Sequence, residues 1–159
     1  MPFIILISAI AIAGIDQLFK FLVAEYLKPV GSVDVIPNLF SLTYVENKGA
    51  AFGIMSNMRW VFIVFTLIVI AVLIYIVIKN KIKSKLFIIS AILLIGGGIG
   101  NLIDRIFYGY VIDYLSLSFF SPVCNFADYC ITFGTVLLVI YLIFFSNFFK
   151  DNKKVKADE

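Results

Sequence analysis

Two segments of this sequence are mostly apolar, carry no charge and are long enough to cross a lipid bilayer. Residues 60–78 and 86–103 contain no charged side chain. A helix needs about 20 apolar residues to cross the roughly 30 Å of hydrocarbon in a membrane. Two further stretches, at about residues 3–27 and 129–149, are apolar over a similar length. We therefore expect an integral membrane protein that is mainly α, with four transmembrane helices.

The composition agrees with a membrane protein and excludes several kinds of active site. Hydrophobic residues make up 62% of the 159 residues and charged residues only 14%, against about half and about a quarter in soluble domains. The absence of histidine excludes Ser-His-Asp and Cys-His catalysis and zinc sites of the HExxH type. Two cysteines, Cys124 and Cys130, are too few for a disulfide framework or a cysteine zinc site. We expect no metal and no cofactor.

The basic residues predict how the chain is oriented in the membrane. The loop at residues 79–85 and the tail at residues 150–159 together hold eight of the 13 basic residues. Lysine and arginine are enriched on the cytoplasmic side, so both termini should be cytoplasmic. The lysines cluster beside apolar segments, and the net charge is only +3, so we expect no nucleic-acid partner. The outer loops would then be at about residues 28–59 and 104–128.

The whole chain, residues 1–159, is expected to form a single membrane-embedded domain. Its first outer loop does not resemble a flexible linker, because residues 33–45 alternate in part between apolar and polar side chains and are rich in strand-forming residues. That pattern predicts a small extracytoplasmic β-sheet or hairpin.

Four aspartates are predicted to lie near the outer membrane surface. A rise of about 1.5 Å per residue places Asp16 about 22 Å and Asp104 about 27 Å across the membrane from its inner face. Asp128 precedes the fourth apolar stretch, and Asp113 lies in the loop before it. A charge within a bilayer is costly and needs a reason. Asp16 could simply pair with Lys20 on one helix face, and Asp128 could be stabilised at a helix N-terminus.

A pair of these carboxylates in contact would support one definite chemistry. Two carboxylates about 3 Å apart cannot both ionise, so they share one proton, as in the aspartic proteases. The ionised member can take a proton from water while the protonated member donates to a carbonyl oxygen. This hydrolysis needs neither a metal nor a covalent intermediate. The residues alone do not decide which two acids would form such a pair.

Five short sequence blocks, taken together and in this order, resemble those of a known protein family. The blocks are Asp16-Gln17-x-x-Lys20, a second around Asn47-Lys48-Gly49-Ala50-Ala51-Phe52, a third ending in Gly100-Asn101-x-x-Asp104-Arg105, then Val111-Ile112-Asp113-Tyr114, and Asn125-Phe126-Ala127-Asp128. Together they resemble the lipoprotein signal peptidase family, also called signal peptidase II. The resemblance extends from the first apolar stretch into the fourth, so it covers most of the chain.

The resemblance implies a bacterial membrane-embedded aspartyl endopeptidase. Such enzymes remove the signal peptide from prolipoproteins that carry diacylglycerol on a cysteine, and they cut just before that cysteine. By this resemblance Asp113 and Asp128 would be the catalytic dyad, and the small sheet of the first outer loop would form a cradle for the substrate near the outer surface. The residues implied to bind substrate or support the dyad are Asp16, Lys20, Asn47, Gly49, Asn101, Asp104, Arg105 and Asn125. We expect a monomer in the bacterial cytoplasmic membrane, in contact with lipids, with its active site near the outer face.

Three other functions fit parts of the sequence. A four-helix thiol oxidoreductase would use Cys124 and Cys130 at the outer face, although their spacing is not Cys-x-x-Cys. A small proton-coupled transporter would use Asp16, although transport needs an acid that is exposed in turn to both sides. A Ser-Lys peptidase would need Lys20 together with an outer serine such as Ser116.

Overall fold

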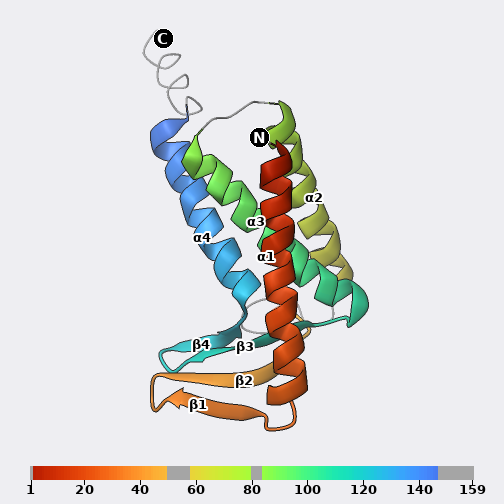
Figure 1. Ribbon diagram of the computed structural model, residues 1–159, viewed down its shortest axis with the longest axis vertical. Coiled ribbons are helices and arrows are strands. Elements are labelled where there is room, and N and C mark those ends of the chain that lie inside the picture. The colour runs from red at the N-terminus through yellow and green to blue at the C-terminus, as the bar shows by residue number, and fades with distance from the viewer. Residues whose placement is uncertain (1, 50–57, 80–83, 147–159) are drawn as a thin grey trace.

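The computed structural model describes residues 2–49, 58–79 and 84–146. This part of the chain forms four long helices and one small antiparallel sheet (Figure 1), which confirms the expected fold class. The helices are α1 (Pro2–Leu22) with its π-helical extension η1 (Val23–Leu27), α2 (Arg59–Lys79), α3 (Lys85–Phe107), and α4 (Phe126–Ile140) with its π-helical extension η3 (Tyr141–Phe145). The strands are β1 (Ser32–Ile36), β2 (Phe40–Asn47), β3 (Val111–Leu117) and β4 (Phe120–Cys124).

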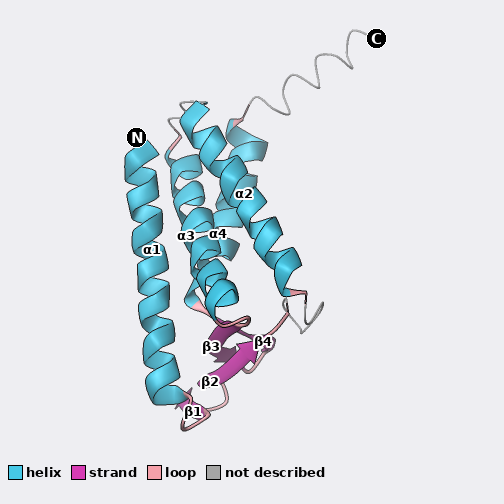
Figure 2. Cartoon of the chain, turned by 90° about the vertical axis from the view of Figure 1, so that its right-hand side faces the viewer, coloured by secondary structure: helices cyan, strands magenta, loops and turns pink. Residues whose placement is uncertain are grey.

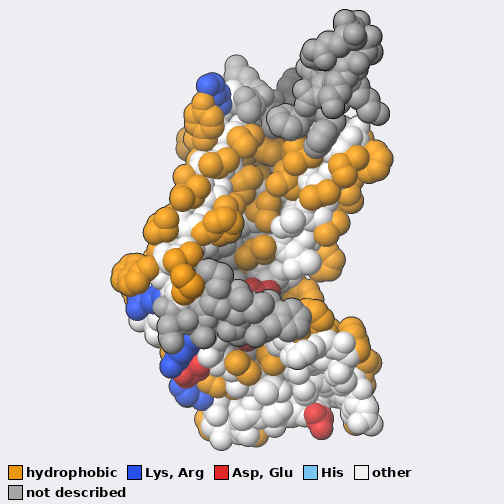
Figure 3. Space-filling model, turned by 180° about the vertical axis from the view of Figure 1, so that it is seen from behind, with side chains coloured by type: hydrophobic (Ala, Val, Ile, Leu, Met, Phe, Trp, Pro, Cys, Tyr) orange, Lys and Arg blue, Asp and Glu red, His pale blue; other side chains and the backbone are white. Residues whose placement is uncertain are grey.

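Each of the four helical segments is long and apolar enough to cross a membrane. Large hydrophobic side chains cover the outside of the helical part (Figure 3), among them Phe65 and Ile68 on α2 and Phe133 on α4. A helix that is apolar on all sides, such as α2, is suited to lie against lipid. The exposed apolar surface of the bundle is therefore the surface that faces the bilayer.

The central helix of the bundle is α3, which packs against α1, α2 and α4. Its glycines allow this close packing. A Cβ atom added at Gly97 would lie 2.6 Å from the carbonyl oxygen of Ala127 on α4, and one added at Gly96 would lie 2.8 Å from that of Ala9 on α1. Glycine is enriched where membrane helices approach this closely. The run of glycines therefore brings α1 and α4 against α3.

The four strands form one antiparallel sheet in the order β1-β2-β3-β4. The sheet lies across one end of the helical bundle, opposite the end that holds the start of α1 and the end of α4 (Figures 1 and 2). The first outer loop supplies β1 and β2, as the alternating pattern predicts. The second outer loop supplies β3 and β4, which that pattern does not predict because residues 111–114 are all buried and apolar apart from Asp113.

Two helix ends differ from the ranges expected from hydropathy. Helix α3 continues to Phe107, so Asp104 and Arg105 lie within the helix and not in a loop starting at residue 104. Helix α4 begins at Phe126 and not near residue 129, so Asp128 lies in its first turn. Hydropathy misses these two ends because they carry polar side chains that have partners inside the protein. The tail at 150–159, residues 80–83 of the inner loop and residues 50–52 of the second block lie outside the described residues.

Candidate active site

Two of the aspartates line one cavity where the sheet meets the helical bundle. Asp113 is the third residue of β3 and is only 1% exposed. Asp128 is the third residue of α4. The cavity has a volume of about 280 Å³, and its lining also includes Asn47, Gly49 and Arg105. The fold thus brings together residues from β2, β3, α3 and α4.

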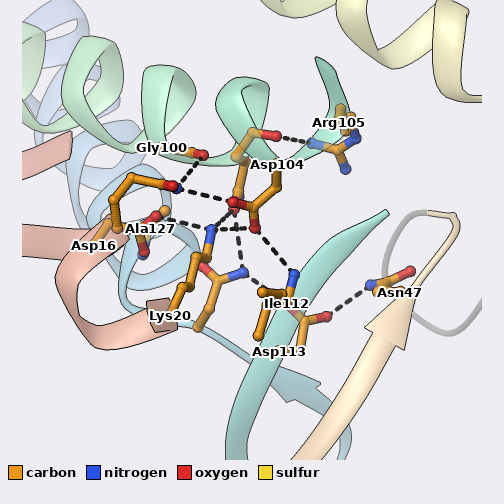
Figure 4. Close-up of polar contacts among 12 residues, drawn as sticks. Asp16, Lys20, Asn47, Gly100, Asp104, Arg105, Ile112, Asp113 and Ala127 are labelled. Atoms are coloured by element: carbon orange, nitrogen blue, oxygen red, sulfur yellow. Dashed lines mark hydrogen bonds and ion pairs between the residues drawn. The ribbon is translucent and has the colours of Figure 1, made fainter. Parts of the chain in front are cut away.

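Both carboxylate oxygens of Asp113 accept hydrogen bonds from asparagine side chains. The Nδ2 atom of Asn125 donates to Oδ1 over 2.6 Å, and the Nδ2 atom of Asn47 donates to Oδ2 over 2.8 Å. Figure 4 shows Asn47 pointing across from β2 to Asp113 on the neighbouring strand. The Oδ1 atom of Asn47 accepts a hydrogen bond from the backbone N–H of Gly49 over 2.9 Å. This second bond fixes the orientation of the Asn47 amide towards the acid.

Asp128 is held by the N-terminus of its own helix and by α3. Asn125 is the N-cap of α4: its Oδ1 atom accepts from the backbone N–H of Asp128 over 2.8 Å. The Oδ2 atom of Asp128 accepts in return from the backbone N–H of Asn125 over 3.2 Å, which completes a capping box. Asn101 donates from Nδ2 to the Oδ1 atom of Asp128 over 2.8 Å. Asn125 therefore donates to both carboxylates, from its side-chain amide to Asp113 and from its backbone N–H to Asp128.

The electrostatic environment favours the protonated form of Asp113. Burial, and after it the negative charge of Asp128, raise the pKa of the Asp113 carboxyl to about 7. A positive charge lies in the same cavity, because Arg105 lines it as well. The guanidinium of Arg105 stacks 5.0 Å from the ring centroid of Phe62, a cation–π contact that restrains it. The cavity therefore combines two acids, one fixed cation and oriented amides.

A second polar cluster joins α1 to α3 (Figure 4). The ammonium of Lys20 pairs with Asp16 over 2.8 Å and with Asp104 over 2.9 Å. The simple ion pair of Asp16 and Lys20, one of the alternatives for these residues, therefore exists, but it is part of a larger group. Lys20 also donates to the Oδ1 atom of Asn101 over 2.8 Å, which connects this cluster to Asp128.

One residue of this cluster is missing from the set selected on the sequence. The Nε2 atom of Gln17 donates to the Oδ1 atom of Asp104 over 2.9 Å and to the carbonyl oxygen of Gly100 over 3.1 Å. Gln17 is a polar residue inside an apolar span, directly after Asp16. That position is the signal that could have identified it, because polar residues within a span usually face a partner.

The structure does not favour the cysteines as a redox pair. Cys124, on β4, and Cys130, buried in α4, are both free thiols. Burial raises the pKa of the Cys124 thiol to about 11, so it stays protonated at neutral pH and is a poor nucleophile. Among residues 2–49, 58–79 and 84–146, no three histidine, cysteine or acidic side chains are grouped in a way that could hold a metal ion.

Comparison with known proteins identifies the family of this chain. The family model described as signal peptidase (SPase) II matches residues 8–144. The chain belongs to the signal peptidase II family. A lipoprotein signal peptidase of Caldanaerobacter subterraneus subsp. tengcongensis is 47% identical over 130 residues, which cover 82% of this chain and 89% of that protein. One of Clostridium acetobutylicum is 43% identical over 154 residues, which cover 94% of this chain and 96% of that protein.

Solved structures agree with membership of the signal peptidase II family. A bacterial membrane enzyme solved by the in meso method at 1.9 Å is 32% identical, with a TM-score of 0.79 over 89% of this chain and 94% of that one. A second, solved at 2.3 Å, has a TM-score of 0.80 over 87% of each chain, also at 32% identity. The resemblance seen in the five sequence blocks is thus confirmed. As a member of the signal peptidase II family the chain is a multi-pass membrane peptidase.

Proposed function

We propose that this chain is an aspartic endopeptidase that removes signal peptides from diacylglyceryl-modified prolipoproteins and cuts just before the lipidated cysteine. Asp113 and Asp128 form the catalytic dyad. The observation that carries this proposal is that both carboxylates line one cavity and that both accept a hydrogen bond from Asn125, from its side-chain amide to Asp113 and from its backbone N–H to Asp128. The raised pKa of Asp113 supports it, because aspartic catalysis needs one protonated and one ionised acid.

The reaction in this site is the addition of water to a peptide bond. The ionised carboxylate takes a proton from water while the water oxygen bonds to the carbonyl carbon, and the protonated carboxyl donates to the carbonyl oxygen. The C–N bond then breaks: one carboxyl gives its proton to the leaving amine, and a hydroxyl of the tetrahedral intermediate returns a proton to the other carboxylate, so that the dyad again holds one proton. Asn47, Asn101 and Asn125 hold the carboxylates in place by donating to three of their four oxygens. Arg105 and Gly49 lie where they can contact the substrate backbone or the lipid headgroup.

The walls of the cavity suit a lipidated substrate. Its apolar lining includes Phe120, Val123 and Ile131, and α4 also presents apolar side chains to the lipid. The substrate of the proposed reaction is an acylated cysteine next to a membrane-spanning signal helix. No metal or cofactor takes part in this proposal, and one copy of the chain supplies both acids.

The proposed orientation places both termini in the cytoplasm and the active site at the outer face of the bacterial cytoplasmic membrane. Lys79 and Lys85 lie at the helix ends farthest from the sheet, with two more lysines between them in the sequence. By the positive-inside rule this end faces the cytoplasm. The sheet and the cavity beside it then face outwards, where exported prolipoproteins carry their cleavage site.

Cleavage of a diacylglyceryl-modified precursor peptide by the purified full chain in detergent tests the proposal. Wild type, Asp113→Asn and Asp128→Asn are compared, and the folding of each is checked by thermal unfolding. Asp34→Asn is the matched control, because Asp34 lies exposed on β1. We expect wild type and Asp34→Asn to cut before the lipidated cysteine and both dyad variants to be inactive.

Two results would contradict the proposal. A folded dyad variant that cuts at nearly the wild-type rate would show that its aspartate is not catalytic. A wild-type enzyme that leaves a confirmed lipidated precursor intact would show that the substrate class is wrong. An unlipidated precursor serves as the comparison, and we expect it to be cut much more slowly.

A further inference from the structure

Two buried carboxylates each hold the backbone next to one of the proposed catalytic aspartates. The Oδ2 atom of Asp104 accepts a hydrogen bond from the backbone N–H of Ile112 over 3.0 Å, and Ile112 directly precedes Asp113. The Oδ1 atom of Asp16 accepts one from the backbone N–H of Ala127 over 3.0 Å, directly before Asp128. Asp16 and Asp104 are both 0% exposed. The same kind of contact therefore occurs once for each member of the dyad.

Lys20 joins these two contacts into one unit. Its ammonium has three protons to donate, and three acceptors lie within 2.9 Å: the Oδ2 atoms of Asp16 and Asp104, and the Oδ1 atom of Asn101. Lys20 is itself only 1% exposed. Without this cation the two buried carboxylates would be left uncompensated, which is strongly unfavourable. The position of the ammonium therefore fixes where both carboxylates lie.

The helix packing around this unit leaves little room for movement. A Cβ atom added at Gly100 would lie 2.5 Å from the Oδ2 atom of Asp16, so α1 lies directly against α3 at this level. Gln17 holds the other oxygen of Asp104 over 2.9 Å. The carboxylates of Asp16 and Asp104 are thus restrained on several sides, and the two peptide N–H groups that they accept from are restrained with them.

We propose that Lys20 is a positioning residue that sets the separation of the Asp113 and Asp128 carboxyl groups through Asp16 and Asp104. This inference rests on the proposed dyad and names the residue that positions its two carboxyl groups. Lys20 contacts neither substrate nor the reacting atoms in this role. It acts through the peptide units of Ile112 and Ala127, from which the two catalytic side chains extend. A misplacement of about 1 Å at a catalytic group can cost about 10²-fold in rate.

The test uses the variant Lys20→Arg in the purified full chain, with the lipidated precursor peptide as substrate. Arginine keeps the positive charge but replaces a compact ammonium with a larger planar fork. We expect kcat to fall about 10²-fold with KM unchanged, because the dyad geometry changes while the substrate contacts do not. Lys28→Arg is the matched control, since Lys28 is half exposed and pairs with Glu46. A Lys20→Arg enzyme with the kcat of the wild type would overturn the proposal.

A second measurement does not depend on whether Lys20→Arg folds. Asp16→Asn and Asp104→Asn each alter one side of the unit, and the double variant alters both. If Lys20 couples the two sides, the double variant should have about the same kcat as the slower single variant, because the effects of residues that act as a unit are not additive. Single effects that multiply in the double variant would show that the two sides act independently and would overturn the proposal.

The dyad variants separate this inference from the function on which it rests. If Asp113→Asn or Asp128→Asn cleaves normally, the proposed dyad is wrong, and the role of Lys20 is wrong with it. Suppose instead that both dyad variants are inactive, that Lys20→Arg keeps the kcat of the wild type, and that the effects of Asp16→Asn and Asp104→Asn multiply in the double variant. The proposed dyad is then retained, and only the positioning role of Lys20 is wrong.

Discussion

The surroundings of Asp113 raise the pKa of its carboxyl group, and this pKa predicts how the reaction rate depends on pH. Its pKa of about 7, against an ordinary value of 3.8, means that it keeps its proton in acid and loses it as the pH rises through about 7. Above that pH both carboxylates are ionised and no acid is left to protonate the carbonyl oxygen. We expect kcat/KM to fall about tenfold per pH unit above 7, measured as initial cleavage rates from pH 5 to 9. A rate that still rises at pH 9 would contradict this assignment.

Asn125 has two roles that different substitutions can separate. Asn125→Ser can keep the cap of α4, since serine is a good N-cap residue, while Asn125→Ala removes the cap at a cost of about 1 kcal/mol. Neither replacement provides the amide N–H that Asn125 donates to Asp113. We expect both variants to lose most of their activity and only Asn125→Ala to unfold at a lower temperature. Cleavage assays and thermal unfolding test this, and an active Asn125→Ser enzyme would show that the bond to Asp113 is dispensable.

The four aspartates show how far the positions of single residues can be predicted from the sequence. Counting residues along each span predicts that Asp16, Asp104, Asp113 and Asp128 gather near one membrane surface, and the structure brings all four into one polar network. Counting cannot tell which of them share a cavity and which share Lys20. That division depends on how the peptide units before Asp113 and Asp128 lie in three dimensions, and no one-dimensional pattern contains this information. The catalytic roles themselves come from the family resemblance and stay proposals.

At the scale of elements, the contact between α3 and α4 determines where Asp128 lies. Gly97→Ala should disturb it, because the added methyl group would lie 2.6 Å from the carbonyl oxygen of Ala127 and would push the first turn of α4 away. Gly14→Ala is the matched control, since an added Cβ there meets nothing within 4 Å. We expect Gly97→Ala to lower both the unfolding temperature and kcat, and Gly14→Ala to leave both near the wild-type values. Equal behaviour of the two variants would contradict this view of the helix contact.

The elements also differ in how well the sequence predicts them. The helices follow from apolar length alone, and β1 and β2 follow from a period of two. A period of two does not predict β3 and β4. The first four residues of β3 are all buried, so its side chains do not alternate between core and solvent. Their pairing with β2 depends on two outer loops meeting in space. Because α2 and α3 separate β2 from β3 in the chain, no local sequence pattern predicts that these two strands pair.

At the scale of the whole molecule, the orientation in the membrane can be measured directly. In a variant without Cys124 and Cys130 that is checked for activity, a single cysteine replaces either Asp34, exposed on β1, or Lys79, exposed at the end of α2. A membrane-impermeant maleimide added to intact cells with a permeable outer envelope should label Asp34→Cys. It should label Lys79→Cys only after the membrane is opened. The reverse pattern would place the sheet and the proposed active site in the cytoplasm.

The hydrogen bond from Ala127 to Asp16 joins two residues that are 111 positions apart in the chain. During synthesis α1 enters the membrane first. Asp16 and Lys20 can pair with each other within this helix, but their further partners on α3 and α4 are translated later. The network is complete only when the last helix arrives. A nascent chain that stops before α4 therefore holds a buried carboxylate that lacks one of its donors, at a depth where charges are costly. The active site is therefore assembled only after α4 has been translated and inserted. Truncated chains that lack α4 should be inactive, and cellular proteases should degrade them faster than the full chain.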